Sequence, residues 1–144
     1  MASDRPVVRI DLPSTFELLD VVQVLSDRFS TRAGLDDDGV HWVSVAVRES
    51  VINAIKHGNR EDRTKRVRVE FELAPAVDPR ELVVCVCDQG TGFDPGSVAD
   101  PLDPENLLKS SGRGIFFMRN FMDDVTVEPL PGGGTAVRMR KKLT

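Results

Sequence analysis

Residues 88–94, DQGTGFD, directly follow a continuous apolar run, LVVCVC, at residues 82–87. An unbroken apolar run of this length predicts a central strand that is buried on both faces. An aspartate at the end of such a strand must find a hydrogen-bond donor, because an unpaired buried charge is costly. Gly90 and Gly92 would allow the backbone to approach a flat or charged ligand closely. The stretch therefore predicts a ligand-binding loop, with a glycine-rich turn around a capped Asp88 as the structural alternative.

A polar stripe lies upstream, on the second of two predicted helices. Residues 37–56 carry apolar side chains at helical spacing, which we expect to pack inward: Val40, Val43, Val47, Val51, Ala54 and Ile55. Glu49, Asn53 and His57 are four residues apart, so they fall on one face of that helix. A carboxylate and an amide oxygen one turn apart are suitable ligands for Mg²⁺, which prefers oxygen. A solvated helix face is the alternative.

Two further glycine motifs follow downstream. The segment SSGRGI, residues 110–115, is predicted to begin a helix, and backbone amides at a helix N-terminus can bind an anion. Lys109 and Arg113 could add positive charge there. Three glycines at residues 132–134, followed by Thr135, predict a tight turn into the last strand. An ordinary helix start and an ordinary hairpin also explain these motifs when each is taken singly.

The predicted elements follow one another in the order strand, helix, helix, strand, strand, loop, helix, strand, strand. The strands are expected at residues 7–12, 67–73, 82–87, 125–127 and 135–139, and the helices at about 14–34, 37–56 and 115–122. This order differs from the alternating pattern of a doubly wound sheet. We therefore expect an α+β fold, a two-layer sandwich in which helices cover one face of a mixed sheet. The long irregular stretch at residues 90–112 is typical of a functional loop.

The composition fits one such domain. The chain has 144 residues, of which 40% are hydrophobic and 29% charged, enough for one sizeable core. No apolar run approaches the roughly 20 residues that cross a bilayer, and no apolar signal core follows the N-terminus. We therefore expect a soluble, cytoplasmic domain without membrane contact. The net charge of −4 argues against wrapping of nucleic acid, which needs a basic face.

The two cysteines, Cys85 and Cys87, both lie within the apolar run. Residues i and i+2 of a strand point to one face and lie about 6.6 Å apart at Cα, which is long for a disulfide. A metal site would need further ligands, and His41 and His57 lie on other segments. We therefore expect both thiols to be small apolar groups packed on a sheet face.

The order of the four motifs is more informative than any one of them. An Asn-bearing helix, an Asp-x-Gly-x-Gly loop, a Gly-x-Gly helix start and a Gly-Thr strand entry resemble the GHKL ATPases, which have the Bergerat fold. The resemblance covers nearly the whole chain, about residues 7–143. Residues 114–125, GIFFMRNFMDDV, further resemble the bacterial anti-sigma-factor serine kinases of sporulation and stress partner switches. The resemblance implies a single Bergerat-type domain over residues 1–144, with an ATP lid at about 94–111.

The resemblance also implies a role for each motif residue. Asn53 would hold Mg²⁺ on the phosphates of ATP, and Glu49 would act as general base or orient the attacking hydroxyl. Asp88 would accept a hydrogen bond from the adenine amino group, supported by Thr135. The other positions implied to bind nucleotide are Gly90 and Gly92 beside the base and sugar, and Lys109, Ser111, Gly112, Arg113 and Gly114 near the phosphates. Related kinases often carry a basic residue at the Ser110 position, so Lys109 or Arg113 would have to supply that charge to the γ-phosphate.

Our first functional expectation is an ATP-dependent serine or threonine protein kinase that phosphorylates a small antagonist protein and also binds a sigma factor. The resemblance implies a homodimer. A nucleotide-binding regulatory module with little or no turnover, using ATP or ADP to select partners, is the alternative.

A third possibility, direct nucleic-acid binding, rests on basic residues that acidic ones interrupt: Lys56, Arg60, Arg63, Lys65, Arg66 and Arg68. We expect these to form a solvated surface, and we expect no direct contact with nucleic acid.

Overall fold

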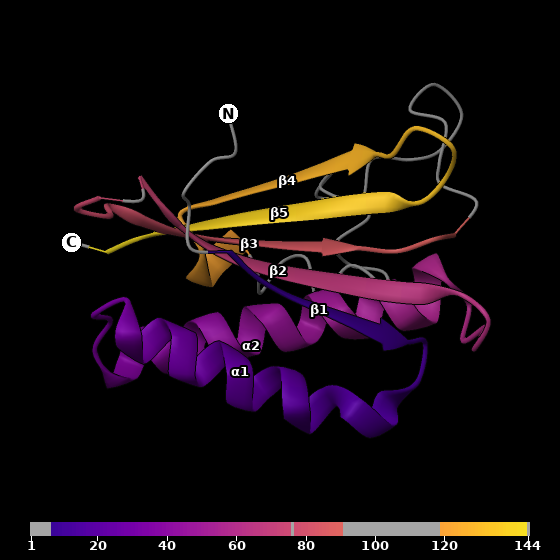
Figure 1. Cartoon of the computed structure of the whole chain (residues 1–144), viewed down its shortest axis with the longest axis horizontal. Helices are drawn as coiled ribbons and strands as arrows, with labels where there is room; N and C mark the ends of the chain where they lie inside the picture. The colour runs from indigo at the N-terminus through magenta and orange to yellow at the C-terminus, as the bar shows by residue number, and fades with distance from the viewer. Residues whose placement is uncertain (1–6, 76, 91–118, 144) are drawn as a thin grey trace.

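The computed structural model describes residues 7–75, 77–90 and 119–143, which form one antiparallel sheet covered on one face by helices (Figure 1). Its five strands are β1 (Val7–Pro13), β2 (Arg66–Ala74), β3 (Glu81–Cys87), β4 (Asp124–Pro129) and β5 (Thr135–Lys142). They lie in the order β1-β2-β3-β5-β4, so β3 is central. Both edge strands, β1 and β4, pair with one neighbour each.

Two helices pack against the sheet as a second layer, α1 (Leu19–Arg32) and α2 (Asp37–Asn53). A single 3₁₀ turn, η1 (Phe16–Leu18), precedes α1, and the Thr15 hydroxyl oxygen accepts from the backbone N–H of Glu17 at its start. Asp36 caps α2 by accepting from the N–H of Gly39 at 2.8 Å. A π-helical turn, η2 (Ala54–Gly58), continues α2. The N-caps therefore fall where the short polar side chains of the sequence predict them.

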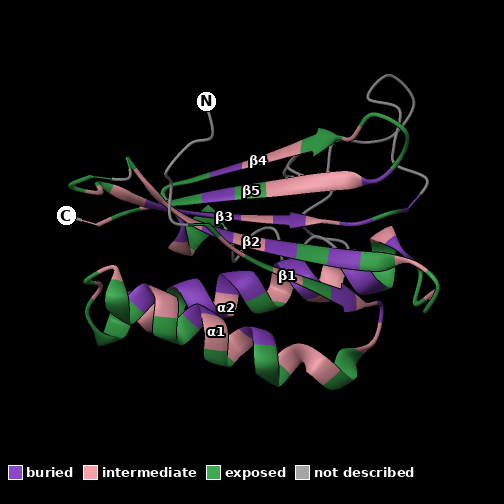
Figure 2. Ribbon diagram, in the orientation of Figure 1, coloured by how far each residue is buried: buried purple, intermediate pink, exposed green. Residues whose placement is uncertain are grey.

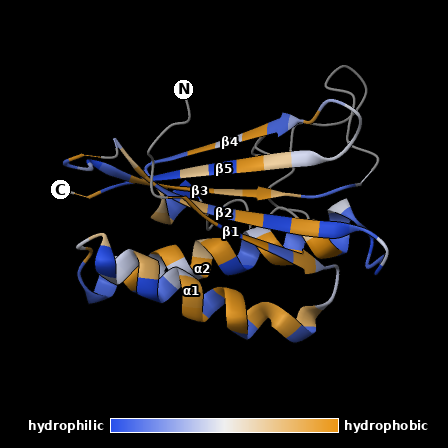
Figure 3. Cartoon of the chain, viewed as in Figure 1, coloured by the Kyte–Doolittle hydropathy of each residue, from blue (hydrophilic) through white to orange (hydrophobic). Residues whose placement is uncertain are grey.

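The core lies between the helices and the inner face of the sheet. Buried positions gather on the sides of the helices that face the sheet (Figure 2). Alternate residues of β2 are fully buried, and β2 alternates in hydropathy, whereas β3 is hydrophobic along most of its length (Figure 3). The largest fully buried side chains include Phe71 of β2, Leu82 of β3, Met139 of β5 and Ile55 of η2. Their burial is the main source of stability, at about 25 cal/mol per Å² of apolar surface.

The sequence predictions for the strands and for the two helices α1 and α2 are confirmed, with shifts of one to three residues at strand ends. The prediction of a mixed sheet is wrong, since all four strand pairings of the described residues are antiparallel. The burial of β3 also differs from the prediction. Its inner face is fully buried, but Cys85 and Cys87 on its outer face are only half-buried, because the described helices cover one face alone.

None of the helices in the described ranges is both long and apolar enough to cross a membrane. The predicted lid at about 94–111 lies outside the described residues, as does most of the helix expected at 115–122. Residues 119–121 are helical, and the ring of Phe121 stacks on that of Trp42 in α2 with a centroid distance of 4.1 Å. The chain following the loop segment therefore contacts α2 directly.

Candidate functional site

Asp88 lies at the end of β3, where the central strand, the start of β5 and the end of α2 meet (Figure 1). Its side chain is buried, and its Oδ1 accepts hydrogen bonds from the backbone N–H of Gly90 at 3.0 Å and of Thr135 at 3.2 Å. The backbone N–H of Asp88 in turn donates to the carbonyl of Thr135 at 3.0 Å. Among the described residues these side-chain hydrogen bonds engage Oδ1 alone. Oδ2 is therefore the oxygen left to accept from a ligand.

Three glycines form the walls around Asp88. A Cβ at Gly58 would collide with the Asp88 carboxylate, and a Cβ at Gly90 would collide with the backbone carbonyl of Gly58. A Cβ at Gly134, whose φ is +97°, would collide with the backbone carbonyl of Asp88. The absence of side chains thus brings the turn after α2, the strand end and the β4–β5 turn into contact. Gly90 was predicted for the site, whereas Gly134 was predicted only as part of a tight turn.

The electrostatic environment of the Asp88 carboxylate favours a ligand that donates a hydrogen bond. Burial raises the pKa of Asp88 above its usual value, and the N–H groups of Gly90 and Thr135 oppose that rise. The carboxylate has lost water without gaining a charged partner among its hydrogen bonds. A ligand N–H directed at Oδ2 would restore part of the lost solvation, since hydrogen bonds to a charged group are the stronger kind.

Glu49 and Asn53 both lie on α2, one turn apart, as the sequence predicts. Both are half-buried, and Nδ2 of Asn53 is buried without a hydrogen-bond partner among the described residues. A buried amide N–H without a partner in the described part of the chain is available to donate to an acceptor such as a phosphate oxygen. The oxygens of this pair fit a Mg²⁺ ion. The described residues contain no group of three or more His, Cys, Asp or Glu side chains able to hold a metal, so phosphate and water would have to complete the coordination.

His57 was predicted to continue the stripe of Glu49 and Asn53, and this stays a prediction, because the helix changes its type of turn after Asn53. The α-helix ends at Asn53, and the next five residues form the π turn η2, closed by the N–H of Asn59 donating to the carbonyl of Ala54 at 2.7 Å. Burial, and secondarily the charge of Lys56, lower the pKa of His57.

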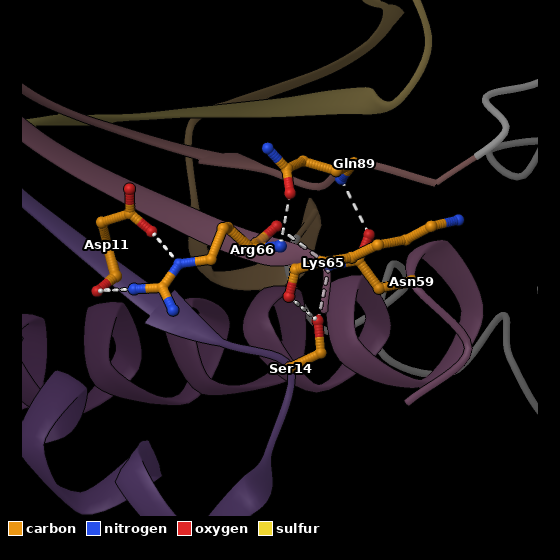
Figure 4. A network of polar contacts seen from close by, with 6 residues as sticks. All are labelled: Asp11, Ser14, Asn59, Lys65, Arg66 and Gln89. Atoms are coloured by element: carbon orange, nitrogen blue, oxygen red, sulfur yellow. Dashed lines mark hydrogen bonds and ion pairs between the residues drawn. The ribbon is translucent and has the colours of Figure 1, made fainter. Parts of the chain in front are cut away.

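Asn59 is the site residue that sequence reasoning missed, and Figure 4 shows why it matters. The side chain is 1% exposed. Its Oδ1 accepts from the N–H of Gln89 at 2.7 Å, and its Nδ2 donates to Ser14 Oγ at 2.7 Å and to the carbonyl of Arg66 at 2.9 Å. Asn59 therefore joins the residue after Asp88 to the end of β1 and the start of β2. The sequence feature that could have pointed to Asn59 is its position directly after Gly58, the glycine that ends the helix.

The same network extends to the edge of the sheet. Gln89 Oε1 accepts from the N–H of Arg66 at 2.6 Å, and Arg66 Nε donates to Asp11 Oδ1 at 2.8 Å. Ser14 Oγ donates to the carbonyl of Lys65 at 2.8 Å. These bonds hold Gln89, the residue directly after Asp88, against the start of β2 (Figure 4).

The structure thus brings together three predicted site residues, Asp88, Gly90 and Thr135, and Asn53 lies at the C-terminal end of α2. Thr135 reaches Asp88 through its backbone N–H and C=O in the hydrogen bonds described above. The remaining predicted positions lie outside the described residues and stay predictions: Gly92, Lys109, Ser111, Gly112, Arg113 and Gly114.

Several of the basic residues considered for nucleic acid are paired with acidic ones. Arg66 contacts Asp11 at 2.8 Å, and Arg63 contacts Glu17 at 3.3 Å. Arg68 approaches Glu70 at 3.8 Å. Pairing of this kind lowers the positive potential that phosphate binding requires.

Comparison with known proteins identifies the family of this site. Residues 12–141 match the family described as the histidine kinase-like ATPase domain. The chain belongs to this family. As a histidine kinase-like ATPase domain, it is similar to the serine-protein kinase RsbW of Staphylococcus aureus, with 27% identity over 139 residues that span 92% of this chain and 85% of that protein. RsbW of Staphylococcus epidermidis is 29% identical over 134 residues, 88% of this chain and 82% of the relative.

Solved structures agree on the fold of the domain. The crystal structure of the RsbU and RsbW domains of Rv1364c from Mycobacterium tuberculosis superposes with a TM-score of 0.63 at 18% identity, covering 94% of this chain and 32% of that one. The mycobacterial sensor histidine kinase MprB superposes with a TM-score of 0.57 at 19% identity, covering 94% and 97%. The expected Bergerat-type architecture is therefore confirmed.

Proposed function

We propose that this protein is an ATP-dependent serine/threonine protein kinase and anti-sigma factor that phosphorylates a small antagonist protein. The observation that carries the proposal is the glycine-walled carboxylate of Asp88, whose Oδ2 is left to accept from the adenine amino group. The similarity to proteins named serine-protein kinase RsbW supports a protein hydroxyl as the phosphate acceptor. Glu49 and Asn53 on α2 carry side-chain oxygens that suit a Mg²⁺ ion bound to the phosphates of the same nucleotide.

In this proposal each site residue contacts a different part of the reacting molecules. Asp88 fixes the base, and its frame through Asn59 keeps the carboxylate from moving when the ligand arrives. Asn53 directs its amide toward the phosphates. Mg²⁺, when bound, would offset the negative charge that phosphoryl transfer must bring together. Glu49, one turn earlier on the helix, orients the acceptor hydroxyl or takes its proton.

The proposed partners are an antagonist protein that receives the phosphate and a sigma factor that competes for the same domain. Phosphate adds about −1.5 to −2 charges to the antagonist at neutral pH, which would change its fit to this acidic protein. We also propose that the domain acts as a homodimer, following the family resemblance. The expected location is the cytoplasm.

The deciding experiment mixes the protein, Mg²⁺ and γ-labelled ATP with a candidate antagonist protein. We expect label on a serine or threonine of the antagonist. Glu49→Gln should reduce the transfer rate by at least about 100-fold while ATP still binds, since general base catalysis typically contributes 10²–10⁴-fold. Glu128→Gln is the matched control, because Glu128 is exposed on β4.

Two outcomes would count against the proposal. Tight ATP binding without transfer would favour a regulatory module that only reports the bound nucleotide. Equal transfer by wild type and Glu49→Gln would remove Glu49 from the reaction.

A further inference from the structure

The outer face of the sheet, opposite the helices, carries the only two cysteines of the chain. Cys85 and Cys87 are successive outward residues of β3, and their Sγ atoms are 3.7 Å apart. Both side chains are half-buried, so solvent reaches them. Neither thiol has a role in the proposed kinase chemistry.

Charged residues surround the pair on neighbouring strands. In the strand register Cys87 lies opposite Arg68 of β2 and Ala136 of β5, and Cys85 lies opposite Glu70 and Arg138. Two thiols without a third ligand among the described residues make a poor metal site. A thiol beside a guanidinium is instead favoured to ionise, and the thiolate is the nucleophilic form.

The two thiols are not equivalent. The hydrogen bond from the Cys85 thiol lowers the pKa of Cys87 to about 7, with help from Arg68 and against burial, Glu70 and Asp88. The pKa of Cys85 is raised, first by that same hydrogen bond and then by burial. Cys87 also lines a hollow of about 390 Å³, whose other lining residues include Arg66, Arg68, Leu130, and the site residues Asp88 and Gln89. The hollow can admit a small reagent to one thiol of the pair.

We propose that Cys87 is a thiol–disulfide exchange site for a low-molecular-weight disulfide, and that Cys85 is its resolving thiol. In the first step the Cys87 thiolate attacks one sulfur of the disulfide. A bond forms between Cys87 and that sulfur, the original S–S bond breaks, and the other half leaves as a thiolate that takes a proton from water. The product is a mixed disulfide within the hollow.

In the second step Cys85 loses its proton to water and attacks Cys87 Sγ. The Cys85–Cys87 bond forms, and the second half of the reagent leaves as a thiolate and is protonated. Two protein thiols have then lost two electrons, and one small disulfide has become two thiols. A separation of about 6.6 Å between the Cα atoms lies at the long end of the range for disulfides, so we expect this step to be slower than the first.

The expected rate advantage follows from the ionised fraction. At pH 7 a thiol of pKa about 7 is about half ionised, whereas one at the ordinary 9.0 is about 1% ionised. The lower basicity reduces intrinsic nucleophilicity by roughly eight-fold over two pKa units. Cys87 should therefore react faster than an ordinary thiol at pH 7, because the gain in ionised fraction exceeds the loss of nucleophilicity.

The test uses 5,5′-dithiobis(2-nitrobenzoic acid), whose released thiolate is coloured, together with mass spectrometry of the intact chain. Wild type should release two equivalents and end two hydrogen masses lighter, without an adduct. Cys85→Ser should release one equivalent and keep one adduct, and Cys87→Ser should react at least about five-fold more slowly. Two adducts on wild type, or equal rates for the two single variants, would overturn the proposal.

Two further measurements separate reactivity from a loss of folding. Cys85→Ala removes the hydrogen-bond donor that Cys85→Ser keeps, so its pH–rate midpoint should lie higher than that of Cys85→Ser. In urea, where the chain is unfolded, Cys85→Ser and Cys87→Ser should react equally. A difference that persists in urea, or identical pH profiles for the serine and alanine variants, would contradict the role of the folded pair.

Discussion

At the level of single residues, the site is marked by polar side-chain atoms that have no hydrogen-bond partner among the described residues. Asp88 is a buried acid, and within the described ranges its side chain accepts hydrogen bonds at one oxygen only. Asn53 is a half-buried amide whose Nδ2 has no hydrogen-bond partner in those same ranges. Both were found from the sequence, because a polar residue at the end of an apolar strand or on an apolar helix is conspicuous. Asn59 was not found, because an asparagine after a helix-ending glycine is common in turns that have no function.

Replacing Asp88 by asparagine separates binding from folding. Asp88→Asn should weaken ATP binding by about ten-fold or more, because a charged acceptor becomes neutral and the atom facing the adenine amino group can become a donor. Titration calorimetry measures the affinity. Asp27→Asn, on the exposed side of α1, is the matched control and should bind as wild type does. An unchanged affinity in Asp88→Asn would place the base elsewhere.

Asn53→Ala tests the phosphate end of the same nucleotide. We expect wild type to bind ATP more tightly with Mg²⁺ than without it, and the variant to lose most of that difference and all Mg²⁺-dependent transfer. Its melting temperature should stay close to that of wild type, since the buried Nδ2 atom makes no hydrogen bond among the described residues. Retained transfer would remove Asn53 from the site.

At the scale of elements, the sequence predicts where strands and helices lie but not how strands are directed. Alternation in β2 and the apolar run of β3 mark strands in either a parallel or an antiparallel sheet, so the mixed arrangement was an open choice. The apolar run of β3 also suggested cover on both faces, since Cys85 and Cys87 count as apolar residues. The π turn η2 could not be predicted, because one extra residue in a turn leaves the surrounding apolar pattern nearly unchanged.

Asn59 tests how far the frame around Asp88 supports the site. Asn59→Ala should lower the free energy of unfolding by about 3 kcal/mol, because it leaves the N–H of Gln89 and other buried groups without their partner. ATP affinity should fall as well, since the strand end would no longer be fixed. Chemical denaturation and calorimetry measure the two effects. Asn120→Ala, at an exposed position, should change neither.

The β4–β5 turn offers a matched pair of glycines with positive φ. A Cβ at Gly132 would meet no atom within 4 Å, whereas one at Gly134 would collide with the Asp88 backbone. Both alanine variants should lose about 1–2 kcal/mol of stability because their backbone must stay in the left-handed region. Gly134→Ala should lose more stability than Gly132→Ala, and it alone should weaken ATP binding. Equal effects in denaturation and calorimetry would show that the turn does not position Asp88.

For the whole molecule, the buried carboxylate of Asp88 lowers the stability of the fold at the place where the ligand is expected to bind. Burial raises the pKa of Asp88, so the folded state holds its proton to a higher pH than the unfolded state does. The folded protein is therefore favoured by this group at low pH, and that advantage disappears as pH rises through the folded-state pKa. At neutral pH the ionised carboxylate opposes folding until a ligand donates to it.

This sign gives a prediction for the pH dependence of stability. Without nucleotide, the free energy of unfolding of wild type should fall relative to that of Asp88→Asn as pH rises from about 3.8, the usual pKa of the residue, toward neutrality. Urea denaturation of both proteins at a series of pH values measures the difference. A difference that changes in the opposite direction would mean that the carboxylate stabilises the empty site.

The stacked pair of Trp42 and Phe121 gives the molecule an optical reporter. Trp42 is the only tryptophan in the chain, and its neighbour in the stack belongs to the residues that follow the predicted lid. Indole emission is sensitive to the ring beside it, so any shift of residues 119–121 against α2 changes the fluorescence of a single, assigned chromophore. Stopped-flow recording of the unlabelled protein would then time nucleotide arrival and departure directly.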